Sequence, residues 1–260
     1  EKMALDIFIA FLLQIAFTIG VIFLLGWLIA LCNKVFYSNF GRFGNIVCYI
    51  TGFVGAPIHE LSHALFCLIF FHRIREIKLF QISDDGTMGY VIHSYNRRNM
   101  YQRIGNFFIG VAPILVMSGL LFLIAWGLLP EFISDIGAFS RSNTSDAREF
   151  FAQIGKVIVS FFSAAVTWQW WVFVLVGLFL ALHMTLSGAD IRNALGGLLF
   201  ILVILAIVDV IVGVVSMEAL NAMTSAIVFV GSGLLCIMLM ALAISVIAML
   251  LSFIARIIRR

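Results

Sequence analysis

The stretch His59-Glu60-Leu61-Ser62-His63 carries the residues whose types and spacing could do chemistry. On a helix, side chains four residues apart share a face, so both imidazoles could bind one zinc ion. Glu60 would then lie beside a zinc-bound water and activate it for hydrolysis. The pattern predicts a hydrolytic zinc site with ligands His59 and His63 and the catalytic residue Glu60.

The composition places this motif in a membrane. Hydrophobic residues make up 63% of the 260 residues and charged residues only 11%, as in a polytopic membrane protein. An alternative is a purely structural hydrogen-bond network at the motif, but ionisable groups inside apolar spans are costly and usually functional. We therefore expect one membrane-embedded metalloprotease domain over residues 1–260.

Apolar runs of about 20 residues predict six transmembrane helices. They lie near 5–31, 46–71, 105–129, 168–186, 195–215 and 225–254. Between the third and fourth, an extracytoplasmic loop over 130–167 contains an amphipathic helical pattern at 147–166. This helix is expected at the membrane interface, and partial insertion into the membrane is an open alternative. The predicted fold class is an all-α polytopic membrane protein with a short surface β-hairpin and this one interfacial helix.

The Lys and Arg residues are unevenly distributed between the two sides of the six predicted spans. They are more numerous at the two termini and in the loop over 72–104 than on the opposite side, which predicts that these parts are cytoplasmic. The net charge of +3 follows from such flanking residues, so no nucleic-acid partner is expected. Single cysteines at 32, 48, 67 and 236, with no C-x-x-C pair, are interpreted as packing residues.

The loop over 72–104 has the pattern of two strands. Residues 76–80 and 88–93 alternate like strands around Asp84-Asp85-Gly86, a turn signal. A strand edge near 90–94 could take up an extended substrate by strand addition, which makes Tyr90, Ile92 and Ser94 candidate substrate-binding residues. The alternative is a hairpin that only covers helix ends.

A catalytic zinc ion normally takes three protein ligands, so a third must come from outside the motif. The candidates are Asp190, after the fourth span, and Asp209, inside the fifth, with His183 and His93 as weaker options. The predicted spans put Asp190 at the membrane surface, where it would reach the zinc only if the stretch from 188 to 197 dips inward. They put Asp209 too deep by about as much. Pro57 also predicts a helix break, with the metal-bearing helix beginning there.

Two segments and one later residue carry a family resemblance: Gly55-Ala56-Pro57-Ile58-His59-Glu60-Leu61-Ser62-His63-Ala64, Gly110-Val111-Ala112-Pro113-Ile114 and Asp190. In these residues the chain resembles the site-2 protease family of intramembrane zinc metalloproteases, peptidase family M50. In this chain Gly188-Ala189-Asp190-Ile191 replaces the Leu-Asp-Gly context common in that family. The resemblance implies that Zn²⁺ is held by His59, His63 and Asp190.

The expected function is zinc-dependent hydrolysis of peptide bonds in membrane-embedded or membrane-proximal substrates. Expected partners are a membrane protein or peptide substrate, the lipid bilayer and a regulatory membrane protein. Two alternatives stay open: a non-proteolytic zinc-binding membrane protein, such as a sensor, transporter or pseudoprotease scaffold, and a peptidase that trims short peptides or prenylated tails.

Overall fold

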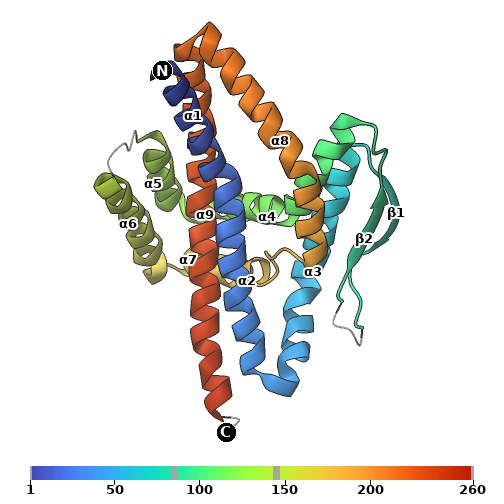
Figure 1. Cartoon of the computed structure of the whole chain (residues 1–260). Coiled ribbons are helices and arrows are strands. Elements are labelled where there is room, and N and C mark those ends of the chain that lie inside the picture. The colour runs from blue at the N-terminus through green and yellow to red at the C-terminus, as the bar shows by residue number, and fades with distance from the viewer. Residues whose placement is uncertain (1, 84–86, 143–146, 259–260) are drawn as a thin grey trace.

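The computed structural model describes residues 2–83, 87–142 and 147–258. Across these residues the chain is mostly helical, with one small two-stranded antiparallel sheet (Figure 1). Six helices are long and apolar enough to cross a membrane. The predicted fold class is confirmed.

Two long helical columns that run parallel to each other form the centre of the molecule (Figure 1). The first joins α1 (Lys2–Ile15), the π-helix η1 (Ala16–Gly20) and α2 (Val21–Asn39) without a break; the second is α9 (Met217–Ile258). At about 1.5 Å per residue, α9 exceeds the thickness of a bilayer core. In Figure 1, α1 begins and α9 finishes at opposite ends of the molecule, which does not support the prediction that both termini share the cytoplasmic side.

The helix that carries the motif is continuous. After the short 3₁₀-helix η2 (Gly41–Phe43), α3 runs from Gly44 to Ile69 and passes through Pro57. The predicted break at Pro57 is therefore wrong. Membrane helices tolerate an internal proline because neighbouring groups can satisfy the backbone carbonyl that it leaves without a donor.

The predicted hairpin is confirmed, with shifted strand ends. Strand β1 (Arg73–Lys78) pairs antiparallel with β2 (Tyr90–Ser94), with an irregularity between Ile74 and Glu76. The predicted turn at 84–86 lies outside the described residues. The hairpin lies close to the motif helix because only residues 70–72 separate the end of α3 from β1.

Small residues bring α4 (Met100–Leu128) and α8 (Gly188–Val215) into close contact. A Cβ atom added at Gly110 would lie 2.4 Å from the backbone oxygen of Asp190 and 2.6 Å from the backbone nitrogen of Ala194. One added at Gly197 would lie 2.5 Å from the backbone nitrogen of Phe107. Such backbone proximity is typical of small-residue interfaces between membrane helices, and here it fixes the start of α8.

The region between α4 and α8 differs most from the sequence prediction. The loop expected over 130–167 contains α5 (Pro130–Arg141), α6 (Ala147–Ser163) and the 3₁₀-helix η3 (Ala164–Val166). The run 148–166, predicted to be interfacial, is one of the six helices long and apolar enough to cross a membrane. The number of such helices agrees with the six predicted spans, but the helix at 148–166 was not among the predicted ones.

The fourth predicted span, 168–186, is too long. Helix α7 (Trp168–Ala181) has only 14 residues, or about 21 Å of helix, less than the roughly 30 Å of a hydrocarbon core. Leu182, His183 and Met184 follow it outside any helix and are buried. An apolar run read along the sequence cannot distinguish a buried non-helical segment from the end of a helix.

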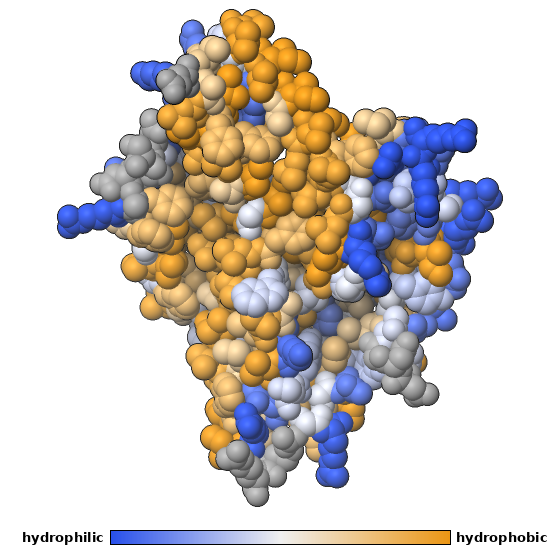
Figure 2. All heavy atoms as spheres, viewed as in Figure 1, coloured by the Kyte–Doolittle hydropathy of each residue, from blue (hydrophilic) through white to orange (hydrophobic). Residues whose placement is uncertain are grey.

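The outer surface is largely apolar. Figure 2 shows hydrophobic residues over most of the visible face, with hydrophilic residues gathered on the hairpin side and at the lower end. Many large apolar side chains of α8 are exposed, among them Leu199, Val203 and Ile211. A surface this apolar needs a lipid or protein cover, as in an integral membrane protein.

Substitution of Gly110 tests the close packing of α4 on α8. Gly110→Ala is expected to lower stability by about 1–3 kcal/mol, because the added methyl group collides with backbone atoms of α8. Gly119→Ala on the same helix is the matched control, since a Cβ there meets nothing within 4 Å. Thermal unfolding of purified protein in detergent measures both, and equal midpoints would contradict the packing account.

Candidate metal centre

Three side chains predicted as zinc ligands converge in the structure. His59 and His63 project from one face of α3 with ring centroids 4.9 Å apart. The Asp190 carboxylate lies 3.1 Å from His63 Nε2 and 3.7 Å from His59 Nε2. One donor atom from each residue lies within 4.8 Å of the other two, so the group is compact enough to surround one ion.

Backbone carbonyls set the tautomer of both histidines. His59 Nδ1 lies 3.1 Å from the His183 oxygen, and His63 Nδ1 lies 2.7 Å from the Ile109 oxygen. Because a carbonyl oxygen only accepts, each Nδ1 carries the hydrogen and each Nε2 of a neutral ring is left with a lone pair. Metal-binding histidines are commonly oriented in this way.

Those two lone pairs face a carboxylate, which is also an acceptor. Three acceptors pointing at one another repel unless a cation or extra protons lie among them. Two imidazoles and one carboxylate are the donor set of many catalytic zinc sites. The residues therefore fit a zinc ion.

Asp190 is fixed by the start of its own helix. Ser187 is the N-cap of α8, and its side chain accepts from the Asp190 backbone N–H at 3.1 Å. The Asp190 carboxylate accepts in return from the Ser187 backbone N–H at 2.7 Å. This capping box holds the carboxylate against the first turn of α8, where it meets the two imidazoles.

The non-helical segment before α8 explains how Asp190 reaches the motif. Because α7 ends at Ala181, the chain stays inside the protein and α8 begins beside α3. Protein groups cover the backbone there: Asn33 donates to the Ala181 oxygen at 2.8 Å and His59 to the His183 oxygen. Buried irregular backbone needs such partners, and His59 provides one of them.

Glu60 opens onto a cavity next to this group. The cavity has a volume of about 350 Å³, enough for a small peptide segment. It is lined by residues of α3, the hairpin, α4 and the region around Asp190, including His59, Glu60, His63, Gly89, Tyr90, Val91, His93 and Asn193. A Cβ at Gly89 would lie 2.6 Å from Glu60 Cγ, so glycine there leaves room for the carboxylate.

The remaining metal-ligand candidates lie elsewhere. Asp209 is fully buried, but it accepts from Gln14 at 3.0 Å and is not part of the group around His59. His183 contributes its carbonyl oxygen instead of its ring. The ring of His93 lines the cavity but pairs with His72. Burial lowers the pKa of His93 to about 4, so that ring is neutral at neutral pH.

Only one of the three candidate substrate-binding residues lines the cavity. Tyr90 lines the cavity, whereas Ile92 and Ser94 are not among its lining residues. Ser94 accepts a hydrogen bond from Arg75 in β1. Val91 and His93, which the sequence prediction did not choose, do line it. Tyr90 and Val91 are neighbours in the strand and both line the cavity, so the lining is not confined to one face of β2.

Several groups at the site escaped the sequence prediction. The carbonyls of Ile109 and His183 carry no sequence signal, because every residue has one. Gly89 has a weak signal, as a glycine inside a strand pattern often marks a close approach. Ser187 had a usable one, since Ser-x-x-Asp before an apolar run is typical of a capped helix start.

One comparison with known proteins bears on this site. Residues 52–144 match the family model DUF3267, described as "Putative zincin peptidase". The match includes the motif, the hairpin and the whole of α4 and α5, and leaves out Asp190. No curated protein and no solved structure matches the chain.

The match supports a zinc metallopeptidase. It does not distinguish the site-2 protease family from other zincins, so that resemblance stays a prediction.

Substitution of the two buried aspartates tests the third ligand. Asp190→Asn is expected to weaken zinc affinity by more than the roughly 10- to 100-fold typical of outer-shell changes, because one charged donor is lost. Asp209→Asn, which changes another buried carboxylate, beside Gln14, is the matched control and should bind zinc like the wild type. Zinc titration of chelator-treated protein measures both; the reverse pattern would assign the ligand to Asp209.

Proposed function

We propose that this protein is an intramembrane zinc metalloprotease of the site-2 protease type, which hydrolyses peptide bonds of membrane-embedded or membrane-proximal substrates. The observation that carries the proposal is the convergence of His59, His63 and Asp190 next to Glu60 and a cavity. The zincin family match supports the reaction class. The six apolar helices support the membrane setting.

The groups at the site have separate roles in the proposed reaction. His59, His63 and Asp190 would hold a zinc ion, which would act as a Lewis acid toward the scissile carbonyl and increase the acidity of water. The Glu60 carboxylate accepts a proton from the attacking water and gives it to the leaving amide nitrogen. Backbone carbonyls keep both imidazoles in place.

The hairpin gives the substrate a docking edge. Among the described residues β2 pairs along one edge only, with β1, and Tyr90, Val91 and His93 of β2 line the cavity. A helical substrate hides its amide bonds, so it must be extended before attack. Pairing with the second edge of β2 would hold it extended. In this arrangement Tyr90 contacts the substrate, while Ile92 and Ser94 contribute their backbone.

A non-proteolytic zinc protein is the competing function. It needs the metal ligands but has no use for a carboxylate directly after the first histidine, whereas hydrolysis needs one. The position of Glu60 at the cavity wall favours hydrolysis.

Replacement of Glu60 tests the reaction. Glu60→Gln should retain zinc and fold but lose about 10²- to 10⁴-fold in cleavage rate, because the proton acceptor is gone. Cleavage of a transmembrane peptide by purified protein in liposomes measures this, with exposed Glu218→Gln as the control. Undiminished turnover in Glu60→Gln would reject the mechanism.

Proline scanning of β2 tests the docking edge. Proline introduced singly at Tyr90, Val91 and Ile92 removes one N–H each, and neighbouring positions direct that N–H to opposite edges of the strand. Prolines on the free edge should slow cleavage and spare the zinc content and the unfolding midpoint. Those on the β1 edge should lower the midpoint. Unchanged cleavage in every folded variant would show that the substrate does not pair with β2.

A further inference from the structure

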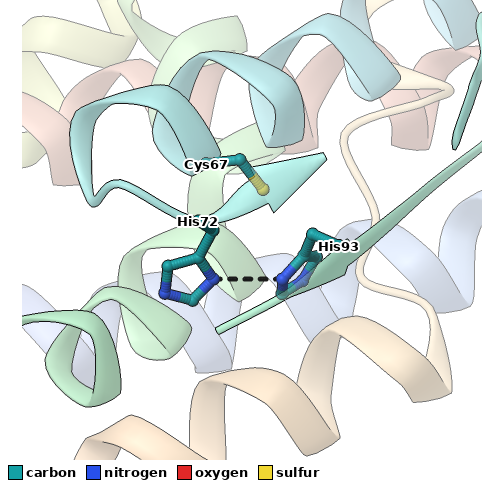
Figure 3. A group of neighbouring side chains, drawn as sticks. All are labelled: Cys67, His72 and His93. Atoms are coloured by element: carbon teal, nitrogen blue, oxygen red, sulfur yellow. Dashed lines mark hydrogen bonds between the residues drawn. The ribbon is translucent and has the colours of Figure 1, made fainter. Parts of the chain in front are cut away.

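A second group of possible metal donors lies outside the candidate centre. Cys67, His72 and His93 each place one donor atom within 4.8 Å of the others. Figure 3 shows the two imidazole rings facing each other, with the Cys67 side chain above them at the end of α3. Cys67 is fully buried, His72 is 4% exposed, and neither residue is used by the proposed reaction.

The end of α3 brings His72 back to Cys67. Phe71 adopts a left-handed conformation with φ of 54°, which is uncommon for a residue with a side chain. The His72 backbone N–H then donates to the Cys67 oxygen at 2.8 Å, as in a Schellman-type helix end. The turn at Phe71 thus places the His72 ring beside the Cys67 thiol.

The His72 ring is oriented like a metal ligand. Its Nε2 lies 2.8 Å from the Gln102 backbone oxygen, so Nε2 carries the hydrogen and Nδ1 keeps its lone pair. That Nδ1 lies 3.0 Å from His93 Nδ1, which therefore carries the hydrogen between the two rings. His72 is therefore oriented like His59 and His63: one ring nitrogen donates to a backbone carbonyl, and the other faces further possible metal-binding atoms.

The distances suit a zinc ion after small side-chain movements. Ligand atoms around tetrahedral zinc lie about 3.3–3.5 Å apart, given Zn–N of about 2.0 Å and Zn–S of about 2.3 Å. The His72 and His93 nitrogens are already at 3.0 Å, and the sulfur lies within 4.8 Å of its partners. His93 also lines the cavity beside Glu60, which gives an ion a route in.

We propose that Cys67, His72 and His93 bind a second zinc ion, separate from the one at His59, His63 and Asp190. Thiolate and imidazole donors favour zinc over calcium or magnesium. Binding releases the Cys67 thiol proton to solvent, and the His93 proton moves from Nδ1 to Nε2 so that both Nδ1 atoms face the ion. The three ligands come from α3, the turn after it and β2, so the ion ties the strand at the cavity wall to the motif helix.

Cobalt substitution tests this site directly, because only the second site has a sulfur ligand. Chelator-treated full-length protein in detergent is loaded with Co²⁺, and the near-ultraviolet band of sulfur-to-cobalt charge transfer is recorded. The wild type and the double variant His59→Ala/His63→Ala should both show the band. Cys67→Ser and His72→Gln should lose it, and Cys236→Ser, another buried cysteine, should keep it.

Zinc content provides the second readout. We expect about two zinc ions per wild-type chain and about one in Cys67→Ser and in His59→Ala/His63→Ala. A wild type without the cobalt band, or a Cys67→Ser variant with as much zinc as the wild type, overturns the proposal. The wild-type spectrum decides even if a variant fails to fold, and neither readout depends on peptidase activity.

Discussion

The arrangement at the candidate centre depends on three hydrogen-bond acceptors that share one small space. Backbone carbonyls hold the hydrogen of His59 and His63 on Nδ1, so both Nε2 lone pairs point at the Asp190 carboxylate. Such a group is unfavourable by itself and becomes favourable around a divalent cation. The fold supplies the energy that keeps these groups together, and the predicted zinc ion relieves their repulsion.

Asp190 reaches the two histidines because α7 ends early. The chain leaves the helix at Ala181 and starts α8 inside the protein, with Gly110 allowing α8 to approach α4. The broken backbone needs donors, and His59 is one of them. One hydrogen bond thus satisfies the carbonyl of the buried His183 and orients a candidate metal-binding ring, so fold and site are coupled.

Much of this could be predicted from the sequence. Composition and apolar runs gave the class and the number of spans, and the strand pattern gave the hairpin. The four-residue spacing placed His59 and His63 on one face of a helix, because that depends only on local geometry. The exchange between the 148–166 and 168–181 helices was missed, since apolar content does not determine where a helix ends inside protein.

Asp190 shows the limit of sequence reasoning most clearly. Its reach to the motif depends on contacts between residues more than a hundred positions apart, which no local pattern encodes. The capping box could have been predicted from Ser187 and Asp190, but the position of this helix start inside the protein could not. Cys67 was expected to serve packing, and only the turn at Phe71 reveals its histidine neighbours.

An anomalous difference map at the zinc absorption edge, from crystals of zinc-loaded wild-type protein, tests the central claim most directly. The account predicts a peak about 2.0–2.2 Å from His59 Nε2, His63 Nε2 and an Asp190 carboxylate oxygen. A map without a peak there, or with a peak at the two histidines and a third ligand other than Asp190, would contradict it.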